Sequence, residues 1–288
     1  MSVKIIADST CDLSKELLEK YEISILPLHI VLGDKEYKDG LEILPDEIYA
    51  WSNANKEAPK TSAASISDAI ELFESNLKSH DEIVCFSISG QMSTTVNVMR
   101  MAAEELDAED KIRIIDSENL STGGGLLVIE AAIMASAGKS GKEIVNAIEQ
   151  LKPQVKASFI VDTLTFLHRG GRCSGVAAFG ANLLSLKPCI VVKDAKMGVG
   201  KKYRGKFGAV LPKYVSERLG DGSDVIKGHI FVTHAGCEPA IINACVEAVK
   251  AIAPEAKIHI TRAGCTISSH CGRNTLGVLF IRTHALGE

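Results

Sequence analysis

The chain has 288 residues, of which 24% are charged and 46% are hydrophobic, and its formal net charge is −4. This balance is typical of a soluble globular protein of one or two domains, and the scattered lysines and arginines indicate no nucleic-acid partner. The N-terminus lacks the apolar stretch of a signal peptide, and Glu130 interrupts the most apolar segment (residues 123–137), so we expect a cytoplasmic protein without an integral membrane segment.

Short apolar runs alternate with longer segments of helical period along the first half of the chain. Strands are predicted at residues 3–7, 23–31, 83–87 and 112–115. Helices are predicted at residues 12–20, 45–53, 67–77, 93–106, 124–137 and 141–151. Pro27 places the second strand at a sheet edge or at a bend. Alternating strands and helices predict a mainly parallel sheet that is covered on both faces.

A second unit with the same alternation follows a change near residues 153–157. Its predicted elements are a strand at 158–161, a Gly- and Arg-rich loop leading into a helix at 167–175, a hairpin at 188–193 and 197–204, helices at 206–219 and 238–252, and strands at 228–233 and 257–261. The predicted fold class is therefore α/β, with two α/β domains whose mainly parallel sheets are covered by helices. The N-terminal domain spans residues 1–155 and the C-terminal domain spans residues 156–288.

Hydroxyl side chains gather in three segments of the N-terminal half. Asp8-Ser9-Thr10 follows the first strand, where such sheets open onto a binding crevice, although a turn with a helix cap explains it equally well. Lys60-Thr61-Ser62 precedes a helix, whose first N–H groups favour an anion, and an N-cap is again the alternative. Residues 87–95 hold five hydroxyls in a strand-to-helix loop, with Ser93 near the expected helix start. This loop suits a carboxylate and lacks the lysine of a nucleotide-binding loop.

Three other segments carry candidate chemistry. Gly123-Gly124-Gly125 has no following lysine, so close helix packing explains it better than phosphate binding. The segment from His168 to Arg172 joins two arginines that could contact carboxylates, phosphate or a partner, or form a solvated loop. Cys265 to Cys271 ends in a His–Cys pair, but neighbouring side chains of an extended segment point apart, and metal-ligand spacing is missing. His270 remains a candidate hydrogen-bond donor to a ligand. The eight cysteines are expected to be reduced and mostly buried as small hydrophobes.

These segments, in this order and over essentially the whole chain, resemble the DegV family, which includes the fatty-acid-binding subunits of bacterial fatty acid kinases. The matching pieces are Asp8 to Leu13, Lys60-Thr61-Ser62, Ser93 before a helix, Ile115-Asp116-Ser117, Gly170-Gly171-Arg172, Ile267 to Gly272 and Leu276-Gly277-Val278. The chain departs from the family pattern in two places. Thr94 stands where the family's serine loop, residues 87–95 in this chain, usually has glycine. Ala63-Ala64 stands where Gln-Pro or a similar pair is usual.

The resemblance implies two α/β domains with one lipid between them. By motif, Thr61 and Ser93 hold the lipid carboxylate and His270 assists. Arg204 matches an arginine associated with the kinase partner or the site entrance, and Arg172 is a second candidate for such a contact. The resemblance implies no metal, no cofactor and no catalytic residue, with the bound fatty acid as the ligand.

The function implied is binding of a long-chain fatty acid, which a separate ATP-dependent kinase subunit then phosphorylates to an acyl phosphate. One alternative is a hydrolase that uses Ser93 or Cys271, although the sequence shows no pattern for the required base. Another is a sugar- or nucleotide-binding α/β module. The missing Rossmann glycine fingerprint argues against a dinucleotide ligand.

Overall fold

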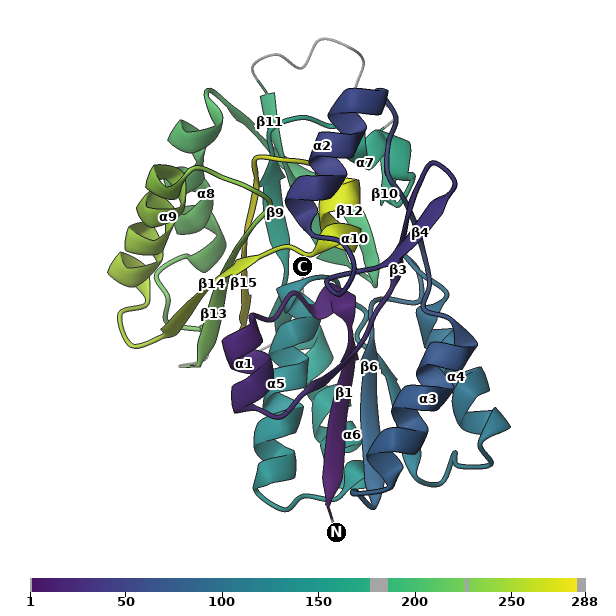
Figure 1. Ribbon diagram of the computed structural model, residues 1–288. Coiled ribbons are helices and arrows are strands. Elements are labelled where there is room, and N and C mark those ends of the chain that lie inside the picture. The colour runs from purple at the N-terminus through teal and green to yellow at the C-terminus, as the bar shows by residue number, and fades with distance from the viewer. Residues whose placement is uncertain (1, 177–185, 226–227, 284–288) are drawn as a thin grey trace.

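The computed structural model describes residues 2–176, 186–225 and 228–283. Within these residues two large sheets lie end to end, with the N-terminal sheet at the bottom of Figure 1 and the C-terminal sheet at the top. The α/β fold class predicted from the sequence is confirmed.

The N-terminal sheet is parallel throughout and is covered on both faces, as predicted. Its strand order is β2-β1-β6-β7, formed by β1 (Val3–Asp8), β2 (Ser24–Leu26), β6 (Glu82–Ser87) and β7 (Ile112–Asp116). Alternate side chains of each strand enter different cores, because successive residues of a strand point to opposite faces. One face packs on α1 (Lys15–Lys20), α5 (Thr122–Ser136) and α6 (Gly141–Leu151), and the other on α3 (Ile66–Leu77) and α4 (Thr95–Glu105).

The C-terminal sheet is mixed, which corrects the expectation of a second mainly parallel sheet. Its order is β10-β12-β11-β9-β15-β13-β14, and β8 pairs with β15. Among the described strands of this sheet, only β10–β12 and β13–β14 pair in parallel, because the hairpin β11–β12 and the returning strand β15 insert antiparallel neighbours. The strands are β8 (Val155–Lys156), β9 (Ser158–Val161), β10 (Cys173–Ser174), β11 (Leu186–Lys193), β12 (Lys196–Arg204), β13 (His229–His234), β14 (Lys257–Arg262) and β15 (Thr275–Ile281).

Different helices cover the two faces of this mixed sheet. Its outer face packs on α8 (Phe207–Leu219) and α9 (Pro239–Ile252). Its inner face meets α5 together with the short helices α7 (Thr165–Gly170) and α10 (Cys265–Cys271). A loop leading into a helix was predicted at residues 167–175. In the structure the helix comes first: α7 ends at Gly170, and a short loop leads from it into β10.

A small antiparallel sheet joins the two halves of the molecule. It has the order β4-β3-β5 and consists of β3 (His29–Leu32), β4 (Lys35–Lys38) and β5 (Lys60–Ser62). Pro27 separates β2 from β3, so the run predicted as one strand at 23–31 is divided between two sheets. After β4 the chain enters α2 (Pro45–Asn55), which packs against α10 (Figure 1). Helix α2 packs on α10, and α5 packs on β13 and β15, so both make contacts across the predicted boundary at residue 155. The division into residues 1–155 and 156–288 stays a prediction.

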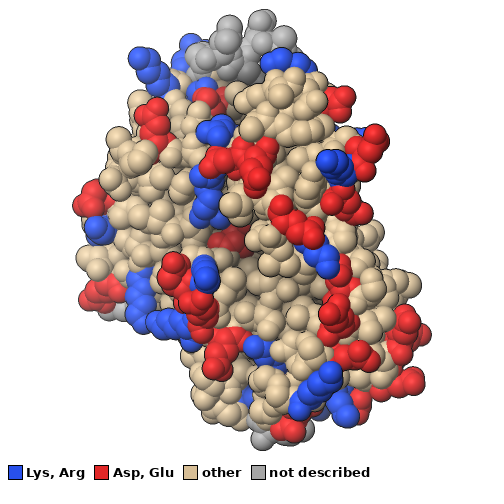
Figure 2. All heavy atoms as spheres, in the orientation of Figure 1, with Lys and Arg blue, Asp and Glu red and all other residues tan. Residues whose placement is uncertain are grey.

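Close packing at the start of α5 confirms the interpretation of the glycine run. A Cβ atom at Gly125 would lie 2.6 Å from the carbonyl oxygen of Cys11, so only glycine fits there. Each of the eight cysteines is buried, as expected. In the described part of the chain, no helix combines the length and the apolar character needed to cross a bilayer. Figure 2 shows lysines and arginines interspersed with acidic side chains over the visible face.

Candidate functional site

A cavity of about 480 Å³ lies where the carboxyl end of β6 meets the inner face of the C-terminal sheet. Its volume falls in the range of small-molecule sites, roughly 300–1,000 Å³. It is lined by segments from both halves of the chain. These include β5, the loop after β6, Leu120, and parts of β9, α7, β12 and α10. Residues far apart in sequence therefore share one concave site.

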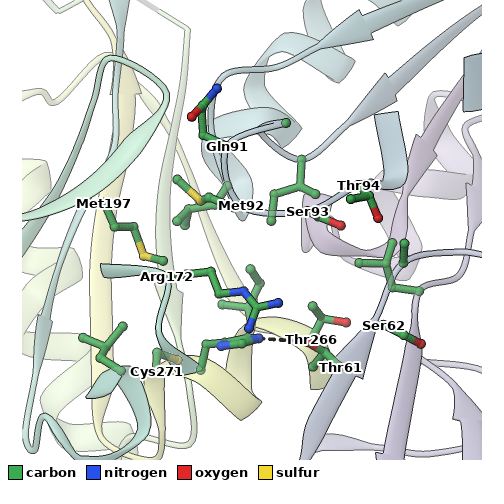
Figure 3. Close-up of a pocket in the computed structure, with 18 of the residues that line it drawn as sticks. Thr61, Ser62, Gln91, Met92, Ser93, Thr94, Arg172, Met197, Thr266 and Cys271 are labelled. Carbon is green, nitrogen blue, oxygen red and sulfur yellow. Dashed lines mark hydrogen bonds between the residues drawn. The ribbon is translucent and has the colours of Figure 1, made fainter. Parts of the chain in front are cut away.

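The cavity has a polar end and an apolar end. Figure 3 shows the hydroxyls of Thr61, Ser93 and Thr94 on one side and the sulfur atoms of Met92 and Met197 on the other. Thr61 and Ser93, the two residues predicted to hold a carboxylate, thus line the same cavity. An elongated ligand with one polar end matches this separation.

Thr61 is joined directly to His270, the third predicted residue. Thr61 Oγ1 lies 2.9 Å from His270 Nε2, although 209 positions separate the residues in sequence. Burial, and secondarily the charge of Arg172, lower the pKa of His270 to about 4. The imidazole is therefore neutral near pH 7, with one N–H donor and one acceptor nitrogen.

The tautomer of His270 decides what Thr61 can offer a ligand. If Nε2 carries the proton, the ring donates to Thr61 Oγ1 and leaves the hydroxyl proton for an anion. The opposite tautomer would take that proton as its own hydrogen bond. Among the described residues, His270 Nδ1 has no hydrogen-bond partner, and a Cβ atom at Gly170 would collide with it. Gly170 thus packs directly against the ring.

The strand pairing of Thr61 corrects one reason given for choosing it. Lys60-Thr61-Ser62 is strand β5, where Thr61 pairs with Ile30, and the cap of α3 is Ser65. Thr61 is therefore held by a sheet and does not lie at the N-terminus of α3.

Ser93 does lie just before a helix, as predicted. Its N–H donates to the Ser89 carbonyl at 3.1 Å, and its Oγ lies 2.9 Å from Thr95 Oγ1. Thr94, which replaces the usual glycine, has φ −86° and ψ 3°, a conformation open to any residue. The unusual loop sequence therefore requires no strained backbone.

The two predicted arginines have different positions. Arg172 lines the cavity, donates to the Gly170 carbonyl at 2.8 Å, and extends between the polar and apolar ends (Figure 3). Arg204 ends β12 and is exposed outside the cavity lining. Its role as a partner or entrance contact stays a prediction.

The nucleophile interpretations lack an activating base. Ser93 Oγ contacts Thr95, and the described residues supply neither an imidazole nor a carboxylate as its hydrogen-bond partner. Burial raises the pKa of the Cys271 thiol to about 12, the opposite of what a thiolate nucleophile needs. Residues 265–271 form helix α10 and not an extended segment, so His270 and Cys271 diverge by about 100° around its axis.

The apolar lining was missed from the sequence, because a side chain that borders a cavity has the same sequence pattern as one in the core. Leu120, Phe159, Ile267 and Cys271 line the main cavity and also a second chamber of about 30 Å³ behind it. These four side chains form the wall between the two spaces.

The comparisons with known proteins agree with this architecture. The profile of a family described as an uncharacterised protein, DegV family, matches residues 2–283. The chain belongs to the DegV family. The resemblance drawn from the ordered sequence motifs is thereby confirmed.

Relatives within the DegV family align over nearly the full chain. A DegV domain-containing protein from Caldanaerobacter subterraneus is 30% identical over 279 residues, covering 96% of this chain and 98% of the relative. A DegV family structure from Thermus thermophilus, described for fatty acid binding, has 28% identity and a TM-score of 0.86, covering 98% of this chain and 100% of the other. A stearic-acid-binding protein from Eubacterium ventriosum has 28% identity and a TM-score of 0.83, covering 98% of each chain.

We predict that the His270 ring stays neutral, with its proton on Nε2, between pH 8 and about pH 5.5. Its burial beside Arg172 lowers the pKa to about 4. A proton on Nδ1 would be buried without a partner among the described residues, whereas a proton on Nε2 can be donated to Thr61 Oγ1. Long-range ¹H–¹⁵N NMR of the imidazole nitrogens, assigned with His270→Ala, measures tautomer and midpoint together. Arg172→Gln should raise the midpoint, because it removes the nearby positive charge. A wild-type midpoint near 6.5, or a proton on Nδ1, would contradict the prediction.

Proposed function

We propose that this protein binds one long-chain fatty acid and presents its carboxylate to a separate ATP-dependent kinase subunit, which converts it to an acyl phosphate. One observation carries the proposal: the cavity separates hydroxyls at one end from apolar side chains at the other, in a fold shared with DegV proteins described as fatty-acid-binding.

The apolar end supplies most of the affinity in this proposal. Each methylene removed from water contributes roughly 0.8 kcal/mol, so a long acyl chain brings on the order of 10 kcal/mol before ordering costs. Met92 and Met197 suit such a lining, because their flexible thioethers adapt to different tail conformations.

The polar end orients the head group without a buried cation. Thr61 and Ser93 each offer an O–H donor, and in the predicted tautomer His270 donates to Thr61 Oγ1 and leaves the Thr61 O–H free for the ligand. Gly90, Gln91 and Thr94, which border the cavity beside Ser93, are exposed. The carboxylate therefore lies near solvent, where burial costs less and where a second protein can reach it.

The proposed role is that of a carrier with no catalytic residue and no cofactor of its own. Neither Ser93 nor Cys271 is activated as a nucleophile in this structure. The phosphoryl-transfer machinery would therefore belong to the partner subunit.

Protein purified from a bacterial host should carry a stoichiometric fatty acid, because a cavity with this lining favours a long acyl chain. Mass spectrometry of the lipid released on denaturation checks this. Lipid-free refolded protein should then bind an added long-chain acid. Absence of both the released lipid and the rebinding would remove the basis of the proposal.

The same lipid-loaded sample tests the presentation step. ATP alone should give no acyl phosphate, whereas ATP with a kinase subunit from the same organism should give one that hydroxylamine traps as the hydroxamate. Hydroxamate formed by the isolated chain would show that it is itself a kinase.

Thr61→Ala and Ser93→Ala should each weaken fatty-acid binding about ten- to a hundred-fold, since a hydrogen bond to a charged group is worth about 1.5–3 kcal/mol. Titration calorimetry with the free acid and with its methyl ester measures the effect. Wild type should prefer the acid, and both variants should narrow that preference. Ser65→Ala, which removes the α3 cap outside the cavity, is the matched hydroxyl control. If Thr61→Ala and Ser93→Ala both kept the wild-type affinity for the acid and the wild-type preference for acid over ester, the head group would have to bind elsewhere.

Ile267→Ala should shift the preferred chain length toward longer acids, because it opens the wall to the second chamber. Each added methylene that finds space contributes about 0.8 kcal/mol, or roughly four-fold in Kd. Binding of a series of saturated acids checks the shift. Leu28→Ala, which enlarges the main cavity but leaves the second chamber closed, is the control and should shift the optimum less than Ile267→Ala. The same optimum in Ile267→Ala as in wild type would show that the wall does not limit the tail.

A further inference from the structure

Helix α10 carries much of the cavity wall but is too short to be stable alone. It has seven residues, and isolated helices of fewer than about 12 residues are marginal in water. Thr266, Ile267, His270 and Cys271 all line the cavity. Thr266 and His270, four positions apart, lie on the same face of the helix. The orientation of His270 must therefore come from contacts made by the rest of the protein.

Two buried carboxylates bind the N–H groups at the start of this helix. Asp12 accepts from the Gly264 N–H at 2.8 Å. Asp39 accepts from the N–H groups of Cys265 and Thr266 at 2.8 and 3.0 Å, and from the Thr266 hydroxyl at 2.6 Å. Hydrogen bonds to an ionised carboxylate are roughly twice as strong as neutral ones. Both carboxylates come from segments more than 200 positions away in sequence.

Asp39 is fixed to the sheet that carries Thr61. It directly follows β4, its N–H donates to the Leu28 carbonyl at 2.8 Å, and its carboxylate accepts from Ser9 Oγ at 3.2 Å. Strand β4 pairs with β3, which in turn pairs with β5 at Thr61. One side chain thus joins the sheet that holds Thr61 to the helix that holds His270.

We propose that Asp39 is a positioning residue for the head-group site: it sets α10 against the β4-β3-β5 sheet so that His270 Nε2 meets Thr61 Oγ1. This rests on the proposed function for its effect on fatty-acid binding. The positioning of His270 itself is a property of the ligand-free protein. Asp39 is 2% exposed and lies outside the cavity lining, so it acts through α10 and not on the ligand.

Asp39→Asn tests the proposal, because asparagine keeps the shape but replaces one acceptor oxygen with a donor amide that cannot bind an N–H group. In the ligand-free protein, the His270 ring nitrogen signals should shift in the direction seen in Thr61→Ala. Glu82→Gln is the matched control, since Glu82 is also buried and accepts a backbone N–H, from Gly141, far from the cavity. The control should leave the His270 signals in place.

Binding gives the second readout. Asp39→Asn should lose about ten-fold in affinity for the free acid and less for the methyl ester, because both ligands contact the part of the wall that α10 carries, but only the acid also depends on the contact made by His270. In a His270→Ala background, Asp39→Asn should add little further loss, as expected for two residues that act through one contact. A general loss of stability would weaken acid and ester equally.

Unchanged His270 signals in folded Asp39→Asn, or equal losses for acid and ester, would overturn the proposal. If Asp39→Asn does not fold, Ser9→Ala, which removes one donor to Asp39, replaces it and should give smaller shifts in the same direction. Unchanged His270 signals in Ser9→Ala would then overturn the proposal. A wild type that binds no fatty acid would refute the proposed function, while the NMR comparison would still decide the positioning role.

Discussion

Buried aspartates that accept backbone N–H groups hold together the loops around the cavity. Asp8 binds the N–H of Ile88, at the start of the serine loop, at 2.8 Å. Asp12 binds Gly264 before α10 and the hydroxyl of Ser121 before α5. Asp8 thus ties the ends of the paired strands β1 and β6, whereas Asp12 and Asp39 connect the N-terminal part of the chain to the start of α10. Loop positions that would otherwise vary are thereby set by a few charge-assisted hydrogen bonds.

This arrangement explains why Asp8-Ser9-Thr10 is among the motifs shared with the DegV family, although these three residues do not line the cavity. Burial raises the pKa of Asp8 to about 6 and that of Asp12 to about 8. In both side chains the cause is burial, which disfavours the charged form.

The elements predictable from sequence were those stabilised by local signals. Helix α6 matches its predicted bounds, because Ser140 and Glu143 form a capping box at its start. The β11–β12 hairpin was also predictable, and Asp194 and Ala195 take the positive φ values that its tight turn needs. Such local signals, together with the helical periodicity of the other helices, were sufficient to predict the fold class and most strands of the N-terminal sheet.

Distant partners explain what the sequence analysis missed. Helix α10 contains Ser, Thr, Cys and His, which are weak helix formers, and its N-terminal anchor Asp39 lies 226 positions from Cys265. Strand β5 owes its conformation to β3, about 30 residues earlier, and not to its own three residues. The motif residues Thr61, Ser93 and His270 line one cavity, and the geometry that brings them together depends on these non-local contacts.

The proposed head-group site, made of hydroxyls and a neutral imidazole, suits a carrier that must release its ligand's reactive end. A buried arginine would bind the carboxylate through a strong bidentate pair and lower its nucleophilicity. Arg172 is exposed and already donates to the Gly170 carbonyl, so it leaves the head group less tightly held. In the proposed carrier, retention and orientation are therefore separate: the apolar wall holds the tail, and Thr61, Ser93 and His270 orient the carboxylate. A kinase could then displace the weak head-group contacts while the tail stays bound.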